Sequence, residues 1–473
     1  MPAIERAQHV DMLWALADTF GPRRWSLGHT TIVLSLYGLR VLAGGLAEIT
    51  HLDVDARGMW DSLRRSNEPL RAAEDVFRRL TAKEPFSLFE GSRERVAARV
   101  REDQLSRAIL KLDRLDVNVR TFEDVAQVGE AVDHYLAAIA ETGSGARGES
   151  FTPRALNVLG ANLVLPHGPS ADELHIQTAY DPACGFGGSL VALFQRFASS
   201  HDETRRLRLY GQDLEIATLF VCTWNFLLHG ITDFKLAAGD VLQEPGFVKE
   251  DRDALEVFDV ILSHPPLNWL SPEELHDFDR FQRYRYGPMP KRRADYAFVQ
   301  HILASLSERG RAGVFVSIGA LSRSFEREVR ENLVHKGVVE AVISFPGGAV
   351  AQSSAPIALL VFSLNQDPSK RDEILFVDVS SYRVKRHQPL PPEMIDRVTA
   401  AYLRWASAPT LSAVVSLHDV AANDYDLTPT RFVSQLVQSV PDIDDIESKI
   451  QGLEEELADA RARLNRALKR LDD

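Results

Sequence analysis

The sequence predicts an α/β fold in which a mostly parallel sheet is covered by helices on both faces. Between about residues 151 and 378, short apolar runs alternate with segments whose apolar residues recur every three or four positions. This alternation is typical of strands joined by crossover helices. A glycine-rich turn at residues 181–188 separates the first such run from a helical pattern, and acidic residues close the next two predicted strands. Open α/β sheets bind ligands at this edge, so we expect a site there.

The composition is that of a globular protein with a sizeable core. The 473 residues are 45% hydrophobic and 26% charged, which allows two or three domains. Two cysteines, Cys184 and Cys222, cannot form a disulfide framework or a cysteine-rich metal site. We therefore expect a reducing cytoplasm and no metal. Charged residues interrupt the first 19 positions, so we expect neither a signal peptide nor a membrane partner.

Residues 1–141 are predicted to form an all-helical N-terminal domain. Apolar residues recur at helical spacing in residues 4–20, 69–80, 93–112 and 125–139. Residues 142–150, Thr-Gly-Ser-Gly-Ala-Arg-Gly-Glu-Ser, have the composition of a flexible linker. We place the first domain boundary there.

The α/β domain is predicted to span residues 142–380. Its strands are expected at residues 174–181, 206–212, 233–238, 257–263, 312–317, 337–344, 356–364 and 373–378. Its helices are expected at residues 187–199, 214–228, 294–308 and 324–335. The last strands follow one another without a helix, so we expect the far edge of the sheet to be antiparallel.

Two segments follow the α/β domain. Residues 381–440 form a mixed extension that prolines interrupt. In residues 441–473, apolar residues step by three and four from Ile443 to Leu468, with charged residues between them. This pattern predicts a coiled-coil-like heptad helix, which cannot bury its apolar stripe alone. We expect it to dock on another chain or on the helical domain.

A glycine-rich turn and three acidic residues mark the predicted ligand site. Gly185 and Gly187 let the backbone approach a ligand closely, and the helix after them offers free N–H groups. Asp181 ends the strand before the turn. Asp213 closes the next strand, where a carboxylate can accept both ribose hydroxyls of a nucleoside. Asp240 follows the third strand and can accept from an adenine amino group. Together these residues predict a nucleoside cofactor.

Five short motifs follow one another in the order of a known enzyme family. They are Gly-Glu-Ser-Phe-Thr-Pro at 148–153, Asp-Pro-Ala-Cys-Gly-Phe-Gly-Gly at 181–188, Tyr-Gly-Gln-Asp at 210–213, His-Pro-Pro-Leu at 264–267 and Asp-Leu-Thr-Pro-Thr-Arg-Phe at 426–432. The chain resembles the amino-type DNA methyltransferases, most closely the modification (methyltransferase) subunit of type I restriction–modification systems. The match covers roughly residues 147–433. It implies a Rossmann-like methyltransferase domain that methylates adenine N6 in double-stranded DNA, within a type I-like restriction–modification or defence complex.

The resemblance also implies which residues bind the cofactor, S-adenosylmethionine. These are Phe151, Thr152, Pro153, Asp181, Ala183, Gly185, Gly187, Asp213 and Asp240. The residues taken by themselves predict a nucleoside cofactor with a carboxylate at its ribose, and the two interpretations agree.

The catalytic motif departs from the family pattern at two positions. In the family, Asn, Asp or Ser precedes Pro-Pro and an aromatic residue, whereas this chain has His264, Pro265, Pro266 and Leu267. The amino group of a flipped adenine there donates hydrogen bonds to the first side chain and to the carbonyl between the prolines. Neutral His264 has one ring nitrogen that can accept such a bond. Leu267 offers apolar contact but no ring on which a base can stack.

A basic segment follows this motif in a chain whose formal net charge is −13. An acidic protein repels phosphate, so its affinity for DNA must be local or supplied by a partner. Aromatic residues are interleaved with the basic ones, as in segments that contact phosphates and bases. A solvated loop paired with acidic residues is the alternative. The predicted DNA contacts are Arg283, Arg285, Lys291, Arg292 and Arg293.

The resemblance implies partners and leaves other functions open. In the family a separate specificity subunit reads the DNA sequence, and we expect residues 441–473 to dock on such a subunit. A restriction subunit is an open further partner. Because His264 and Leu267 replace the usual residues, a catalytically silent relative that acts as a scaffold is an alternative. Methylation of RNA or of a protein glutamine is another, but the helical N-terminal region and residues 428–432 favour DNA.

Overall fold

A computed structural model describes most of the chain between residues 6 and 433. The described residues are 6–21, 26–92, 100–115, 117–141, 152–165, 176–199, 206–250, 253–267, 279–289, 293–350, 354–382 and 390–433. The predicted linker at 142–150 and the predicted heptad helix at 441–473 lie outside them.

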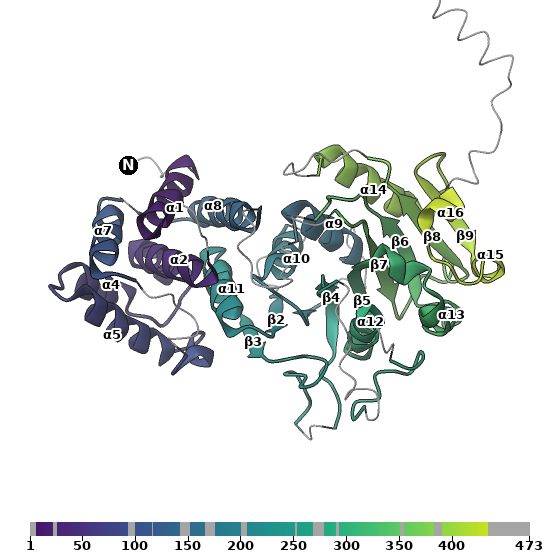
Figure 1. Cartoon of the computed structure of the whole chain (residues 1–473), viewed down its shortest axis with the longest axis horizontal. Helices are drawn as coiled ribbons and strands as arrows, with labels where there is room; N and C mark the ends of the chain where they lie inside the picture. Colours follow the sequence, from purple (N-terminus) through teal and green to yellow (C-terminus); the bar gives the residue numbers. More distant parts are fainter. Residues whose placement is uncertain are drawn as a thin grey trace, which may run out of the picture.

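In the described part of the chain, one nine-stranded sheet has the order β3-β2-β1-β4-β5-β7-β6-β8-β9 (Figure 1). Its strands are β1 (Thr178–Asp181), β2 (Arg208–Asp213), β3 (Phe234–Ala238), β4 (Phe258–Ser263), β5 (Leu306–Ser317), β6 (Val339–Ser344), β7 (Ile357–Ser363), β8 (Glu373–Asp378) and β9 (Ser412–Ser416). Neighbours pair in parallel except that β7 is antiparallel to β5 and β6, and β9 to β8. The strand order reverses at β1, which lies between β2 and β4, and ligands bind at such a switch point.

Helices cover both faces of the sheet because alternate strand residues point to opposite sides. In β7, Leu359 and Val361 belong to the core on one face, and Leu360 and Phe362 to the core on the other. The helices on the first face are α9 (Arg154–Val164), α10 (Gly188–Ala198), α11 (Ile216–Leu228) and α14 (Pro392–Arg404). Those on the second are α12 (Asp295–Ala304), α13 (Arg327–His335), α15 (Leu417–Ala422) and α16 (Pro429–Val433).

The N-terminal region is helical, in agreement with its apolar periodicity. Its helices are α1 (Arg6–Phe20), α2 (Leu27–Val41), α3 (Ala47–Ile49), α4 (Ala56–Arg64), α5 (Pro69–Thr81), α7 (Glu102–Asp113) and α8 (Phe122–Glu141), with a π-helical segment η1 (Leu42–Leu46) and a short 3-10 helix η2 (Ser87–Phe89). α2 begins after Ser26, whose hydroxyl accepts from the His29 N–H at 3.3 Å. Tyr37 of α2 and Trp224 of α11 lie in the same apolar cluster. The helical region and one face of the sheet therefore share a continuous core.

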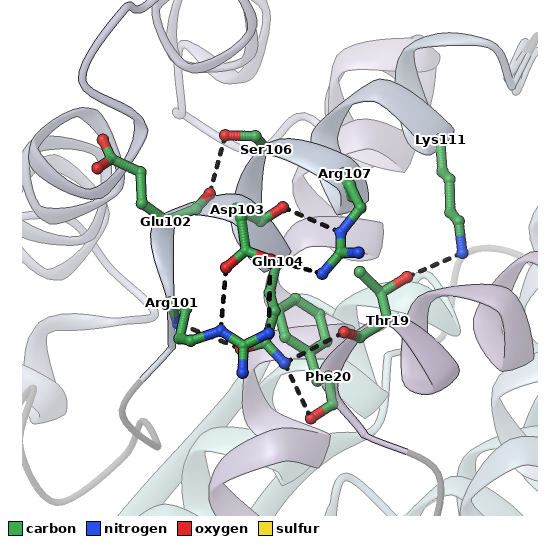
Figure 2. Close-up of polar contacts among 9 residues, drawn as sticks. All are labelled: Thr19, Phe20, Arg101, Glu102, Asp103, Gln104, Ser106, Arg107 and Lys111. Atoms are coloured by element: carbon green, nitrogen blue, oxygen red, sulfur yellow. Dashed lines mark hydrogen bonds and ion pairs between the residues drawn. The ribbon is translucent and has the colours of Figure 1, made fainter.

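Side chains of α7 close the C-terminal end of α1, as Figure 2 shows. Lys111 Nζ donates to the Ala15 carbonyl at 2.8 Å and to the Thr19 hydroxyl at 2.9 Å. Gln104 Nε2 donates to the carbonyls of Thr19 and Phe20 at 3.3 and 3.4 Å. The last carbonyls of a helix have no partners within it and carry partial negative charge. Gln104 satisfies two of them, and together with Lys111 it fixes α7 against α1.

One helical stretch in the described part of the chain, Leu27–Ile49, is long and apolar enough to cross a membrane. Its mean hydropathy is 1.6, and 61% of the apolar window is buried inside the fold. Core helices of folded domains share these properties, so the stretch is weak evidence for a membrane span. Its residues pack in the core of the helical region.

The structure corrects three details of the predicted elements. The helix expected at 294–308 ends at Ala304, and β5 already begins at Leu306, which pairs with Phe258 of β4. The antiparallel strand β7 lies inside the sheet rather than only near its far edge. β9, which was not predicted, pairs with β8 and makes that edge antiparallel. Residues 412–416 of the predicted mixed extension thus continue the sheet.

Candidate active site

Asp181 lies at the C-terminal end of β1, at the switch point of the sheet. Its side chain is buried, and its Oδ1 accepts hydrogen bonds from the Ala183 N–H at 3.0 Å and from the hydroxyl of Ser263 at 2.7 Å. Ser263 is the last residue of β4. Burial raises the pKa of Asp181 to about 7 although these hydrogen bonds lower it. Asp181 is therefore a carboxyl group whose ionisation a cationic ligand would favour.

The glycine-rich turn packs between Asp213 and α11. Gly185 and Gly187 have φ values of 52° and 83°, which side-chain-bearing residues rarely adopt. The Gly185 N–H donates to Asp213 Oδ2 at 3.0 Å. A Cβ on Gly187 would lie 2.5 Å from the Phe226 ring, whereas a Cβ on Gly185 would point into open space. Gly187 thus allows tight packing on α11, and Gly185 leaves room for a ligand.

Asp213 and Asp240 lie at the same edge of the sheet, after the paired strands β2 and β3. Asp213 Oδ1 accepts from the Glu215 N–H at 3.0 Å, and burial raises the pKa of Asp213. Asp240 Oδ1 accepts from the Leu242 N–H at 2.9 Å, and its Oδ2 accepts from the Gln243 side chain at 3.0 Å. Each carboxylate oxygen has lone pairs left for a ligand. The three predicted acids therefore lie at one edge of the sheet, at or after the ends of neighbouring strands.

His264 directly follows β4 and is buried, with 7% of its surface exposed. Its Nδ1 lies 2.8 Å from the Thr152 hydroxyl oxygen, and its ring lies 5.1 Å from the Phe315 ring of β5 at an angle of 44°. Its Nε2 has no hydrogen-bond partner among the described residues. Burial lowers the pKa of His264 to about 4, so the ring is neutral at pH 7.

Hydrogen bonds connect Thr152 to α10 through Asn157 of α9. The Thr152 carbonyl accepts from Asn157 Nδ2 at 3.3 Å, and Asn157 Oδ1 accepts from the Ser189 hydroxyl at 3.1 Å. The sequence did not predict Asn157, Ser189 or Ser263 as site residues. The place of Ser263 directly before the catalytic motif was a usable signal, whereas no pattern marked Asn157.

A family model decides which proteins this chain is related to. The model described as N-6 DNA Methylase matches residues 123–439, more than half of the chain. The chain belongs to the N-6 DNA methylase family. The resemblance predicted from the ordered motifs is thereby confirmed. The match begins within α8 and includes the extension that continues the sheet.

Relatives of this chain include methylase subunits of type I restriction enzymes. The MpnII methylase subunit of Mycoplasma pneumoniae is 25% identical over 345 residues, which cover 71% of this chain and 62% of the relative. The MjaVIII methylase subunit of Methanocaldococcus jannaschii is 30% identical over 323 residues, which cover 65% of this chain and 53% of the relative. The matched region thus spans between half and two thirds of these relatives.

Solved structures share the fold of this chain. The methyltransferase subunit of a type I restriction–modification system from Streptococcus thermophilus has a TM-score of 0.74 at 19% identity, and the likeness covers 91% of this chain and 100% of that chain. A chain from a study of the assembly and conformational transition of the type I system has a TM-score of 0.69 at 20% identity, covering 98% and 99%. At these identities the likeness shows the fold, and it confirms the predicted fold class.

The other described motif residues follow β4 or precede α9. Pro265 is buried, while Pro266 and Leu267 are half-buried and Leu267 packs against the core. Pro153 precedes α9 and caps its first turn with its carbonyl oxygen. Phe151 lies outside the described residues.

Arg283 of the basic loop has a structural role. Only 4% of the residue is exposed, and its Nε lies 2.8 Å from Asp279 Oδ1. Its guanidinium also donates to the backbone carbonyls of Val241 and Leu242, at 3.4 and 2.9 Å. A side chain committed to these buried partners is not available to a phosphate. We therefore correct the prediction that Arg283 contacts DNA, because Arg283 anchors the loop.

The other predicted DNA contacts are placed only in part. Arg285 is exposed and lies over the Tyr286 ring, 5.2 Å from its centroid. Arg293 is half-buried, and Lys291 and Arg292 lie outside the described residues. Arg285 and its basic neighbours stay predicted DNA contacts.

Proposed function

We propose that the chain transfers a methyl group from S-adenosylmethionine to N6 of adenine in double-stranded DNA. It would do so as the methylase subunit of a type I-like restriction–modification complex. The observation that carries this proposal is the placement of Asp181, the Gly185 turn and His264 at the switch point of an N-6 DNA methylase sheet. Ligands of open α/β sheets bind at this point.

The chain's own residues fit S-adenosylmethionine. Positive charge on the cofactor complements Asp181, whose buried carboxyl has a pKa of about 7. The open space at Gly185 admits a ligand next to the backbone. Asp213 and Asp240 have free lone pairs for ribose hydroxyls and for the adenine amino group. When bound, the cofactor supplies an electrophilic methyl group.

Two acceptors from the motif would hold the target amino group. The neutral ring of His264 offers one lone pair, and the carbonyl of Pro265 offers another. When both N–H bonds of the amino group are engaged, its nitrogen lone pair is directed at the methyl donor. Correct placement contributes most of the rate in such a transfer. Because His264 is buried, the adenine must leave the duplex stack to reach it.

We propose DNA and a specificity-type subunit as partners, the latter docked through the predicted helix at 441–473. A restriction subunit is a further candidate. The net charge of −13 supports this arrangement, because a partner must then supply much of the attraction for phosphate. We place the activity in the cytoplasm, without a membrane partner. The free, buried thiols of Cys184 and Cys222 suit a reducing compartment.

Calorimetry with the purified chain tests cofactor binding first. We expect wild type to bind S-adenosylmethionine and Asp181→Ala to lose binding. The matched control is Asp53→Ala, which removes a carboxylate that is 93% exposed and remote from the sheet edge. Equal binding by wild type and Asp181→Ala would contradict the assignment of the cofactor site.

Transfer of a labelled methyl group to DNA, with the partner subunits present, then tests the reaction. Transfer that Asp181→Ala abolishes supports the proposed enzyme. Cofactor binding without transfer, restored by His264→Asn with Leu267→Phe, would identify a silenced catalytic site. If neither binding nor transfer occurs, the proposal fails and a scaffold role remains. Co-purification with the specificity subunit after deletion of residues 441–473 would refute the docking assignment.

A further inference from the structure

The hydrogen bond between Thr152 and His264 gives Thr152 a role that the motifs did not predict. The two residues are 112 positions apart, and the contact joins the segment before α9 to the end of β4. Thr152 was expected to contact the cofactor, yet its hydroxyl lies 2.8 Å from a ring nitrogen of the catalytic motif. This role rests on the proposed function, in which His264 receives an amino group.

The Thr152–His264 contact is compatible with two positions of the ring hydrogen. If the Thr152 hydroxyl donates to Nδ1, the neutral ring must carry its hydrogen on Nε2. If instead Nδ1–H donates to the hydroxyl oxygen, Nε2 keeps a free lone pair. The first arrangement makes Nε2 a donor, which would repel the N–H of an amino group. The second makes it an acceptor.

The surroundings of the two side chains favour the second arrangement. Nε2 is buried without a partner among the described residues, and a buried N–H without an acceptor is rarer in proteins than an unsatisfied acceptor. Thr152 is only half-buried, so its hydroxyl hydrogen can turn to solvent when the oxygen accepts. The oxygen of that hydroxyl is then free to accept the hydrogen of Nδ1 at 2.8 Å.

Thr152 is itself held in place, which is required if it is to fix the ring. Its carbonyl accepts from Asn157, and Asn157 accepts from Ser189 of α10. The His264 ring also lies against Phe315. The ring is thus fixed by one oxygen and one aromatic face.

We propose that Thr152 is a positioning residue that holds His264 in the tautomer with hydrogen on Nδ1. Nε2 then forms an acceptor-only site, which selects an amino group and rejects a carbonyl oxygen at the same position. The family has an amide, carboxylate or hydroxyl oxygen as acceptor at this position. Here the acceptor would be Nε2 of His264, which cannot donate because Thr152 holds the ring hydrogen on Nδ1.

Nuclear magnetic resonance of the full chain labelled with ¹⁵N-histidine tests this tautomer. Long-range ¹H–¹⁵N correlations report which ring nitrogen carries the hydrogen, and His264→Asn identifies the His264 signals by their loss. We expect hydrogen on Nδ1 in wild type. Thr152→Val keeps the shape of the side chain but removes the oxygen, and should shift hydrogen to Nε2. Thr152→Ser restores the oxygen and should restore the wild-type pattern.

Each result decides the proposal. Hydrogen on Nε2 in wild type, or an unchanged pattern in Thr152→Val, would overturn it. If Thr152→Val does not fold, the wild-type signal decides alone, because the Thr152 oxygen is the partner at Nδ1.

A kinetic comparison separates this proposal from the proposed function. At saturating cofactor, Thr152→Val should lower kcat by about a hundredfold, as loss of one oriented transition-state hydrogen bond does, and Thr152→Ser should recover most of it. If wild type transfers no methyl group but its ring carries hydrogen on Nδ1, the function fails and the tautomer assignment stands. If wild type transfers the methyl group but its ring carries hydrogen on Nε2, the proposed function stands and the tautomer assignment fails.

Discussion

Replacement of His264 by asparagine should make the protein less sensitive to mild acid. Burial lowers the pKa of His264 from its ordinary value of 6.5 to about 4, so the unfolded chain binds this proton more tightly than the folded chain. Stability is therefore lost as the pH falls from 6.5 toward 4. A shift of this size corresponds to about 3 kcal/mol when complete, and to about 2 kcal/mol at pH 5. Asparagine does not titrate and lacks this loss.

The assay is urea unfolding of wild type and His264→Asn at pH 7.5 and pH 5. Only the difference between the two proteins is predicted, because other buried groups titrate as well. The pKa values of His9 and His301 are also lowered by burial, to about 4 and about 3, and add losses of the same sign. Burial raises the pKa of Asp181 and Glu326 to about 7, which acts in the opposite direction. These contributions are common to both proteins.

We expect wild type to lose about 2 kcal/mol more than His264→Asn between the two pH values. The matched control is His418→Asn, which removes a histidine that is 91% exposed and should lose as much as wild type. Equal losses in wild type and His264→Asn would refute the reasoning, since they would show that His264 titrates alike in the folded and unfolded chains.

Three further predictions concern packing and binding. Gly185→Ala should weaken cofactor binding, measured by calorimetry, and should lower stability by about 1 kcal/mol because of its positive φ. Gly187→Ala should prevent folding, measured by circular dichroism, because the added methyl group would overlap the Phe226 ring. Equal effects of the two substitutions would contradict the separate roles of Gly185 in ligand binding and Gly187 in packing. Lys111→Met should lower the free energy of unfolding by about 1 kcal/mol through loss of its hydrogen bonds to the Ala15 carbonyl and the Thr19 hydroxyl, and an unchanged denaturation midpoint would remove that role. Arg285→Ser should weaken DNA binding by the assembled complex and flatten its salt dependence, whereas a change confined to stability would take Arg285, which also contacts Tyr286 and the Leu303 carbonyl, out of the DNA interface.

The sequence predicts the sheet well because its signals are local. Apolar runs separated by helical periodicity identified eight of the strands, including the buried β4, from composition and spacing alone. β9 was missed because Ser412–Ser416 holds only three apolar residues, and its pairing with β8 depends on tertiary contact. The end of the helix before β5 was misjudged because the residues after Ala304 suit a helix as well as a strand.

The site was predictable where chain order brings residues to one edge. Asp181, Asp213 and Asp240 each end or follow a strand, so their convergence follows from parallel topology. The contact of Thr152 with His264 could not be predicted, because it depends on how α9 packs against β4. The burial of Arg283 could not be predicted either, because it also depends on tertiary contacts. A basic residue among aromatics has the same local pattern whether it faces solvent or a buried aspartate.

The raised pKa of Asp181 couples ligand capture to proton release. Near neutral pH about half of the molecules carry a proton on this carboxyl group. A cation that binds next to Asp181 favours the ionised form and expels that proton to the buffer. The heat measured on binding should then vary with the ionisation enthalpy of the buffer, and affinity should rise with pH through neutrality. The buried Asp181 at the end of β1 thus lets the site exchange a proton for a cationic ligand, without a net change in the charge of the site.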